Sequence, residues 1–206
     1  MKAPSPELVA RISEHLAQRG KRPYQPILHP AFSDLGYQNG PERFDLIEPH
    51  LEYKNGTVLD IGSQWGYMAH RLEDLGYRVT AVEASKTNGY FLKELRDLCG
   101  KEFTIIRTSV FKLVEPDFDI VFALNIFHHF MKTAEVFAKF EDLLSRLKCR
   151  MMIYQAHVTT ERQMAGAYRN MTTQEATRFL SERLSLPRVT CIGTFRNGRE
   201  IFKLSQ

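Results

Sequence analysis

Residues 58–67 read VLDIGSQWGY, an apolar run that breaks into a glycine-containing turn. The first four residues suit a buried strand, and a helix is expected from residue 67 onward. Gly62 lets the backbone approach a ligand closely, and Gly66 lets the helix pack near the strand. Free N–H groups and a positive dipole end meet at a helix start. The stretch therefore predicts a strand, a ligand-binding turn and a helix in direct succession.

The sequence after residue 57 alternates between short apolar runs and amphipathic segments. We expect strands at 58–61, 78–83, 103–107, 118–124 and 150–154, and helices at 67–75, 87–98 and 134–147 and from Thr172, where Glu175 completes a capping box. Such alternation predicts an α/β fold with a parallel sheet covered by helices on both faces. The tail RVTCIGTFRNGREIFKLS reads as a hairpin around Asn197-Gly198, so one strand must run antiparallel.

The N-terminal 43 residues differ in character from the rest. A helix is expected over residues 5–18, capped by Ser5 and ended by Gly20. Residues 21–43 hold four prolines and three aromatic residues, which indicates an irregular segment. A short helix over 44–51 precedes the first strand. We therefore expect residues 1–43 to form a helix and lid-like extension, and residues 44–206 to form the main domain.

Composition limits the possible classes of protein. A chain of 206 residues with 43% hydrophobic content and a net charge of +4 fits one globular domain. Basic residues are interleaved with acidic ones, which tolerates an anionic substrate or RNA without requiring either. Cys99, Cys149 and Cys191 show no C-x-x-C spacing, so neither a disulfide framework nor a zinc site is indicated, and a cytoplasmic location is expected. We see no signal peptide and no apolar run long enough to cross a membrane.

Glu83 ends the second expected strand, roughly 20 residues after the glycine turn. An acid at that point can accept hydrogen bonds from two ribose hydroxyls. A glycine turn alone is also compatible with a plain strand-to-helix connection. Turn, acid and spacing together predict a site for a nucleoside-containing cofactor. The NAD fingerprint G-x-G-x-x-G is absent.

With these residues the sequence resembles the class I S-adenosylmethionine-dependent methyltransferases. The family's first motif is a strand running into D-x-G-x-G-x-G, and VLDIGSQWG supplies Asp60, Gly62 and Gly66. Its second motif is the acid, Glu83 in VTAVEAS, and its fourth is the strand FDIVFALNIFHHF. The resemblance covers residues 44–206. It implies a Rossmann-like, seven-stranded, mostly parallel sheet that ends in an antiparallel hairpin.

The resemblance also implies a cofactor and its contacts. The cofactor would be S-adenosylmethionine, with S-adenosylhomocysteine as the product. The residues placed around it are Asp60, Gly62, Ser63, Gln64, Trp65, Gly66, Glu83, Ala84, Ser109 and Asn125. Gln64 replaces the family's middle glycine, so with Trp65 it is expected to shape the methionine end. Ser109 stands where the family usually has an acid that touches adenine.

Two adjacent histidines, His128 and His129, follow the fourth strand, where the resemblance places the sulfonium and the acceptor. A neutral imidazole can take a proton from an attacking oxygen or nitrogen, so both are candidate catalytic bases. The alternative is that they bind backbone groups or pack against the next helix. No acidic residue stands at ligand spacing, so no metal site is expected. Methyl transfer from a sulfonium can also proceed through positioning alone.

Acceptor-binding candidates come from two segments. In the N-terminal extension, Tyr24 and Arg43 could line a lid, and Arg43 could bind a carboxylate or phosphate. Packing of this segment's aromatic residues on the sheet edge is the alternative. His157 and Tyr168, after the fifth strand, are further candidates. Arg199 in the hairpin is expected to be a surface charge.

Three functions follow from these features. The leading hypothesis is a methyltransferase acting on oxygen or nitrogen of a small-molecule or sugar-containing acceptor. The alternative is an RNA methyltransferase, acting on tRNA or RNA ends, which the basic pI of about 9.0 permits. A third possibility is a non-catalytic scaffold or sensor that binds the cofactor. The sequence does not indicate an oligomeric state.

Overall fold

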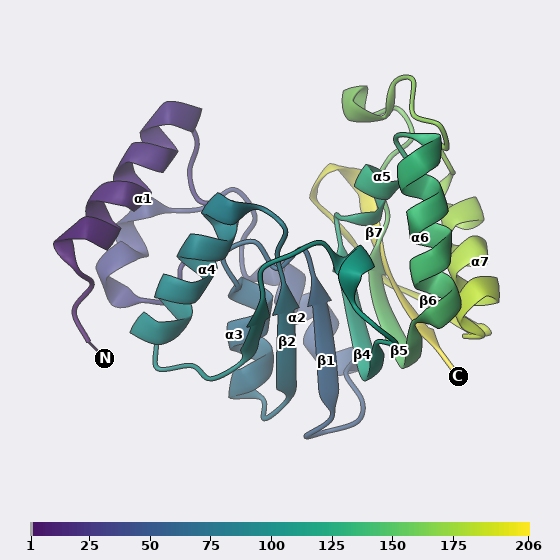
Figure 1. Cartoon of the computed structure of the whole chain (residues 1–206), viewed down its shortest axis with the longest axis horizontal. Coiled ribbons are helices and arrows are strands. Elements are labelled where there is room, and N and C mark those ends of the chain that lie inside the picture. Colours follow the sequence, from purple (N-terminus) through teal and green to yellow (C-terminus); the bar gives the residue numbers. More distant parts are fainter. Residues whose placement is uncertain (1) are drawn as a thin grey trace.

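The computed structural model describes residues 2–206 and has a seven-stranded sheet at its centre (Figure 1). The strands are β1 (Thr57–Ile61), β2 (Arg78–Val82), β3 (Thr104–Ile106), β4 (Asp117–Leu124), β5 (Lys148–Gln155), β6 (Arg188–Phe195) and β7 (Arg199–Ser205). Their order across the sheet is β3-β2-β1-β4-β5-β7-β6. β7 pairs antiparallel with both β5 and β6, and all other pairs are parallel. The predicted Rossmann-like fold is confirmed.

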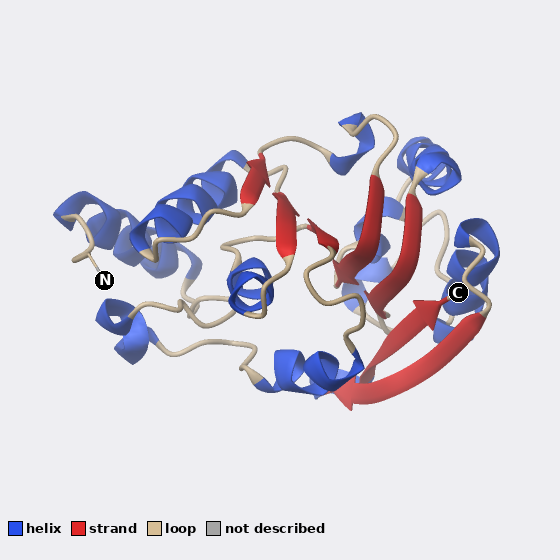
Figure 2. Cartoon of the chain, turned by 90° about the horizontal axis from the view of Figure 1, so that it is seen from below, coloured by secondary structure: helices blue, strands red, loops and turns tan. Residues whose placement is uncertain are grey.

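Helices cover both faces of the sheet. They are α1 (Pro6–Arg19), α2 (Glu42–Ile47), α3 (Tyr67–Asp74), α4 (Lys86–Leu98), α5 (Phe127–Phe130), α6 (Ala134–Arg146) and α7 (Thr173–Leu184). Figure 2 shows the sheet with helices on either side of it. One core cluster joins the sheet to α6 and α7, and a second joins the opposite face to α2 and α3.

Successive side chains of the central strands contribute alternately to the two core clusters on opposite faces of the sheet. Leu59 on β1 and Val121 on β4 are buried in the α6–α7 cluster, whereas Val58 and Ile120 are buried in the α2–α3 cluster. Successive side chains of a strand point to opposite faces, so a strand buried on both faces must be apolar throughout. Among the four buried residues of β1, Asp60 is the polar exception, and it lies on the same face as Val58 because the two are two residues apart.

Helix ends follow the expected capping residues. The Ser5 side chain accepts a hydrogen bond from the Leu8 N–H, and Gly20 ends α1 in the left-handed conformation. Thr172 and Glu175 form the predicted capping box at the start of α7. The single turn α5, which holds both candidate histidines, is not among the helices predicted from the sequence. Four residues are too few to show a helical period.

The N-terminal helix packs beside α4 (Figure 1). Leu8 and Ile12 of α1 are buried in a third cluster, whose other members include Trp65, Phe91 and Leu95. Residues 21–43 were expected to be irregular, and within them Pro30–Leu35 forms a 3-10 helix. At the other end of the chain, β6 and β7 form the predicted hairpin, joined through a 3-10 turn at Arg196–Gly198.

Candidate functional site

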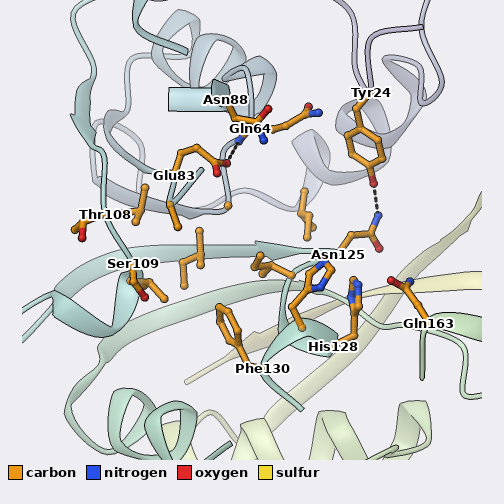
Figure 3. Close-up of a pocket in the computed structure, with 18 of the residues that line it drawn as sticks. Tyr24, Gln64, Glu83, Asn88, Thr108, Ser109, Asn125, His128, Phe130 and Gln163 are labelled. Carbon is orange, nitrogen blue, oxygen red and sulfur yellow. Dashed lines mark hydrogen bonds between the residues drawn. The ribbon is translucent and has the colours of Figure 1, made fainter. Parts of the chain in front are cut away.

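A cavity of about 450 Å³ opens beyond the carboxyl ends of β1, β2 and β4 (Figure 3). The volume is in the range of small-ligand sites. From β1 the chain runs outward through β2 to β3 and then returns to β4 on the other side of β1. Open α/β sheets bind ligands where the strand order reverses in this way. Figure 3 shows Gln64 and Glu83 on one side, here called the turn side, and His128 and Gln163 on the other, the histidine side.

The glycine turn is fastened to the end of β2. The N–H groups of Gly62 and Ser63 both donate to the Val82 carbonyl, at 2.9 and 3.1 Å. Gly62 has a φ of +75°, and a Cβ there would lie 2.9 Å from Cδ1 of Ile126. Gly62 therefore allows both the tight turn and the close approach of the segment after β4.

Gln64 takes the left-handed conformation, with a φ of +54°. Residues other than glycine seldom adopt this conformation. The backbone at this position therefore keeps the shape of a glycine turn although the residue is not glycine. The Gln64 N–H donates to Oε2 of Glu83 at 2.9 Å, and its side chain lines the cavity. The departure from the glycine motif thus adds a side chain to the cavity wall.

Glu83 is clamped by two backbone donors. The Ser85 N–H donates to Oε1 at 2.7 Å, while the Gln64 N–H binds Oε2. Burial raises the pKa of this carboxyl, and the two backbone hydrogen bonds oppose the rise by favouring the charged form. Each oxygen keeps a further lone pair, so the carboxylate can accept from two neighbouring hydroxyl groups of a ligand.

Three motif residues lie behind the turn instead of at the cavity. Trp65 is buried against Phe91, with ring centroids 4.7 Å apart, and its Nε1 donates to Asn88 at 3.2 Å. The structure thus corrects the expectation that Trp65 shapes the methionine end. A Cβ on Gly66 would meet Cδ1 of Leu92 at 2.5 Å, so this glycine serves the packing of α3 against α4. The Ser63 hydroxyl donates back to the Asp60 carbonyl at 2.8 Å.

Asp60 and Arg43 are both buried on the α2–α3 face, close enough for their charges to interact. Burial raises the pKa of Asp60 to about 7, and the nearby Arg43 cation opposes the rise. Arg43 donates to Oε1 of Gln155 at 3.2 Å. Within residues 2–206, Asp60 Oδ2, Arg43 Nε and Gln155 Nε2 have no hydrogen-bond partner. The Arg43 guanidinium lies over the ring of Tyr24, 5.7 Å from its centroid, and Tyr24 itself lines the cavity.

The far end of the turn side follows β3. Thr108, Ser109 and Val110 line the cavity here, together with Ala84 and Asn88. The Ser109 hydroxyl also caps a 3-10 helix by accepting from the Phe111 N–H at 3.4 Å. Asn88 and Thr108 are not among the site residues predicted from the sequence. Asn88 could be predicted, because it lies in the first turn of the helix that follows Glu83.

The histidine side begins at Asn125, directly after β4. Asn125 has a φ of +56°, and its Nδ2 donates to the Tyr24 hydroxyl at 2.8 Å. His128 and His129 both line the cavity, with ring centroids 4.0 Å apart. Burial, assisted by His129 and Arg199, lowers the pKa of His128 to about 3. The more exposed His129 also has a lowered pKa, because of desolvation and the Lys132 charge.

Arg199 is not the surface charge that the sequence indicated. Its side chain is 17% exposed and pairs with Glu161 at 2.6 Å, and it lines the cavity. Arg199 also donates to Oδ1 of Asn125. Gln163 and Phe130 complete this wall and were likewise missed. No local pattern in the sequence marks these three residues. Gln163 comes from a loop, Phe130 from a short turn and Arg199 from the start of a strand in the C-terminal hairpin.

Two acceptor-binding candidates lie away from the cavity. His157 is buried, and its Nε2 is 3.2 Å from Oδ1 of Asn170. Tyr168 is 51% exposed and faces a separate surface hollow beside Arg169 and Phe179. Of the four candidates, only Tyr24 lines the cavity, while Arg43 lies behind it.

In the described part of the chain, no group of three His, Cys, Asp or Glu side chains is arranged to bind a metal ion. None of the helices in residues 2–206 has the length and apolar character needed to span a membrane.

Comparisons with known proteins agree with this geometry. A family model described as a methyltransferase domain matches residues 59–146. Among solved structures, monomeric WbdD, described elsewhere as a bifunctional kinase-methyltransferase, has a TM-score of 0.72 at 22% identity. That alignment covers 93% of this chain and 48% of WbdD, so the chain spans about half of its length.

Two further solved structures share the fold. Magnesium protoporphyrin IX methyltransferase (ChlM) from Synechocystis PCC 6803, crystallised with bound SAM, has a TM-score of 0.59 at 17% identity, covering 79% of this chain and 75% of that one. The PH0226 protein from Pyrococcus horikoshii OT3 has a TM-score of 0.60 at 17% identity, covering 88% and 94%. No curated protein sequence matches this chain.

Proposed function

We propose that this chain, which belongs to the class I S-adenosylmethionine-dependent methyltransferases, transfers a methyl group from S-adenosylmethionine to oxygen or nitrogen of a small-molecule acceptor, sugar-containing compounds included. The observation that carries the proposal is the clamped Glu83 carboxylate. Backbone N–H groups from the glycine turn and from the start of α4 hold it at the edge of the cavity. Its free lone pairs suit the two hydroxyls of a ribose.

The remaining residues of the turn side fit the rest of the cofactor. Gly62, which lacks a side chain at the cavity wall, leaves room for the methionine chain, and Thr108 and Ser109 border the place for adenine. Asp60 Oδ2 and Arg43 Nε are buried without a hydrogen-bond partner, but neither residue lines the cavity, so they support the turn from behind.

When bound, S-adenosylmethionine supplies a methyl group on a positively charged sulfur, which is already activated for transfer. The chain has to bind, orient and dehydrate the reacting groups. Ile126 and Phe130 give the cavity apolar walls near the histidines, which favours exclusion of water.

Of the two histidines, His129 is the better candidate for accepting a proton from the acceptor. A base with a pKa of about 3, as at His128, takes protons weakly at neutral pH. We assign His128 a binding role, in which the neutral imidazole donates or accepts one hydrogen bond. His157, which lies behind His128 with ring centroids 6.2 Å apart, supports that ring from the core side.

The proposal also covers the role of the N-terminal segment and the cellular compartment. Residues 1–43 act as an extension of the methyltransferase domain, and Tyr24 is the part of it that borders the cavity. Cys99, Cys149 and Cys191 are free thiols, which supports a reducing, cytoplasmic compartment.

Binding and transfer can be tested separately. Calorimetry with S-adenosylhomocysteine should give binding that Glu83→Ala weakens about 100-fold and that the exposed-site variant Glu102→Ala leaves intact. A cell extract incubated with methyl-labelled S-adenosylmethionine and the enzyme should then gain label in its small-molecule fraction. Label in the RNA fraction would instead establish an RNA methyltransferase, and binding with no labelled product in any fraction would indicate a sensor.

A further inference from the structure

A chain of side-chain hydrogen bonds crosses the cavity between segments far apart in the sequence. Asn125 donates to the Tyr24 hydroxyl at 2.8 Å and accepts from Arg199. Arg199 in turn donates through Nε and Nη2 to the two oxygens of Glu161, at 2.8 and 2.6 Å. The chain thus joins the N-terminal segment, the end of β4, the start of β7 and the loop between β5 and α7.

Arg199 is the centre of this chain because it uses both sides of its guanidinium. The edge formed by Nε and Nη2 makes a two-point contact with Glu161, and Nη1 binds Asn125. Only 17% of the Arg199 side chain and 20% of that of Glu161 are exposed. A planar fork of five donors makes these contacts together, and a lysine ammonium cannot reproduce that geometry.

Glu161 passes the contact on to the β5–α7 loop, residues 156–172. Its carboxylate also accepts from the Val158 N–H at 3.0 Å and from the Gln163 side chain. Gln163 lines the cavity on the histidine side. Arg199 therefore helps to hold this part of the loop, and with it Gln163 of the histidine-side wall, in place.

At the other end, Asn125 and Tyr24 face the turn side. Both Asn125 groups are used, since Oδ1 accepts from Arg199 while Nδ2 donates to Tyr24. The orientation of the amide is therefore fixed. The Tyr24 oxygen acts as an acceptor in this bond, so its own hydrogen remains free to donate to a ligand in the cavity. A ligand on the turn side therefore contacts one end of this series of hydrogen bonds, and the β5–α7 loop lies at the other end.

We propose that Arg199 is a positioning residue that couples ligand binding on the turn side to ordering of the β5–α7 loop on the histidine side. The inference rests on the proposed function, because the turn-side ligand is taken to be the nucleoside cofactor. Filling the turn side would then assemble the acceptor wall, and an acceptor held by that wall would stabilise the bound cofactor by the same factor.

Hydrogen exchange with and without S-adenosylhomocysteine tests the coupling without knowledge of the acceptor. In the wild-type protein the ligand should slow exchange at residues 62–66 and 83–85, and should also slow it in residues 156–172 by roughly fivefold or more. In Arg199→Ala the first two segments should still be protected, and the loop should lose its response to the ligand. Arg199→Lys should give an intermediate response.

Arg196→Ala is the matched control. Arg196 is in the same hairpin and pairs with Glu42 at 2.7 Å, but it is half exposed and does not line the cavity. It should keep the wild-type response. If Arg199→Ala does not fold, Glu161→Gln weakens the same link from the loop side and should reduce the loop response.

Two results would overturn the coupling while leaving the cofactor site intact. One is protection of 62–66 and 83–85 in the wild type with no change in 156–172. The other is a loop response in Arg199→Ala or Glu161→Gln equal to that of the wild type. If the ligand protects no segment of the wild-type protein, the proposed function and the coupling both fall.

Discussion

The turn side and the histidine side of the cavity are built in different ways. On the turn side, backbone groups near the strand ends make most of the hydrogen bonds. The central contact joins residues 19 apart in the chain, Gln64 and Glu83. On the histidine side, side chains meet from residues 101, 74 and 38 apart. A backbone site tolerates sequence change around it, whereas a side-chain site changes with each substitution. One fold can therefore keep its cofactor and vary its acceptor.

A buried carboxyl behind the turn side and a buried imidazole on the histidine side respond to pH in opposite directions, and this gives the largest expected effect. Asp60 has a native pKa of about 7 against 3.8 for the unstructured side chain. Between about pH 4 and 7 the unfolded chain releases a proton that the native state keeps, so native stability falls as pH rises, by about 1.4 kcal/mol per pH unit. Over the window this amounts to about 4 kcal/mol.

His128 shows the opposite sign. Its native pKa of about 3 lies below the ordinary 6.5. Between these values the unfolded chain binds a proton that the native state does not, so native stability falls as pH falls. Urea unfolding across about pH 4 to 6.5 should show Asp60→Asn gaining on the wild type as pH rises and His128→Gln gaining as pH falls. The exposed Asp34→Asn is the control, and curves parallel to the wild type for all three would refute the assignment.

The second comparison lies within the turn, between Gly66, where glycine is required, and Gln64, where the family's glycine is absent. Gly66→Ala places a Cβ 2.5 Å from Leu92 at a φ of +87°, so overpacking and backbone strain together should cost about 3 kcal/mol. Gly100→Ala, with a φ of +65° and open space around it, isolates the strain alone, about 1 kcal/mol.

Gln64→Gly should change the free energy of unfolding by less than about 1 kcal/mol, because relief of the left-handed strain is offset by the greater freedom of glycine in the unfolded chain. Thermal unfolding of the three variants gives the order. Equal losses for Gly66→Ala and Gly100→Ala would show that the contact with Leu92 relaxes without cost.

The third largest expected effect is the loss of ligand affinity on removing the Glu83 carboxylate. Glu83→Ala removes an acceptor for two ligand hydroxyls and should weaken S-adenosylhomocysteine binding about 100-fold, roughly 3 kcal/mol. Glu83→Gln keeps one acceptor oxygen and should bind with intermediate affinity. Titration calorimetry measures both, with the far-UV spectrum confirming that each variant is folded. Unchanged affinity in Glu83→Ala would place the ribose elsewhere.

The smallest expected change lies at the boundary between the two sides. Tyr24→Phe removes the acceptor for Asn125 and a donor to the cavity but keeps the ring beneath Arg43. We expect about fivefold weaker S-adenosylhomocysteine binding, about 1 kcal/mol, with little change in thermal stability. The exposed Tyr37→Phe serves as control in the same calorimetric titration. A loss of 100-fold or more would mean that Tyr24 belongs to the turn side as fully as Glu83 does.

The same contrast explains what could be predicted from the sequence. The sheet, the hairpin, Gly62 and Glu83 follow from local patterns, because strand periodicity, glycine turns and an acid at a strand end act within about 20 residues. Trp65 was misplaced because its indole faces α1, more than forty residues earlier in the chain, and the motif does not encode that neighbour.

Arg199 was misjudged for a related reason. An arginine beside an Asn-Gly hairpin is usually exposed, and nothing nearby signals that Glu161 and Asn125 will surround it. Such residues are brought together by the order of strands, in which β7 inserts beside β5. Their partners become visible only once that order is known.

The crystal structure of this protein with S-adenosylhomocysteine tests the division of the cavity most directly. We expect the ribose hydroxyls on Glu83, the adenine beside Thr108 and Ser109, and the sulfur directed toward Asn125 and the two histidines. A ligand bound elsewhere, or bound here with its ribose away from Glu83, would contradict the assignment of the two sides.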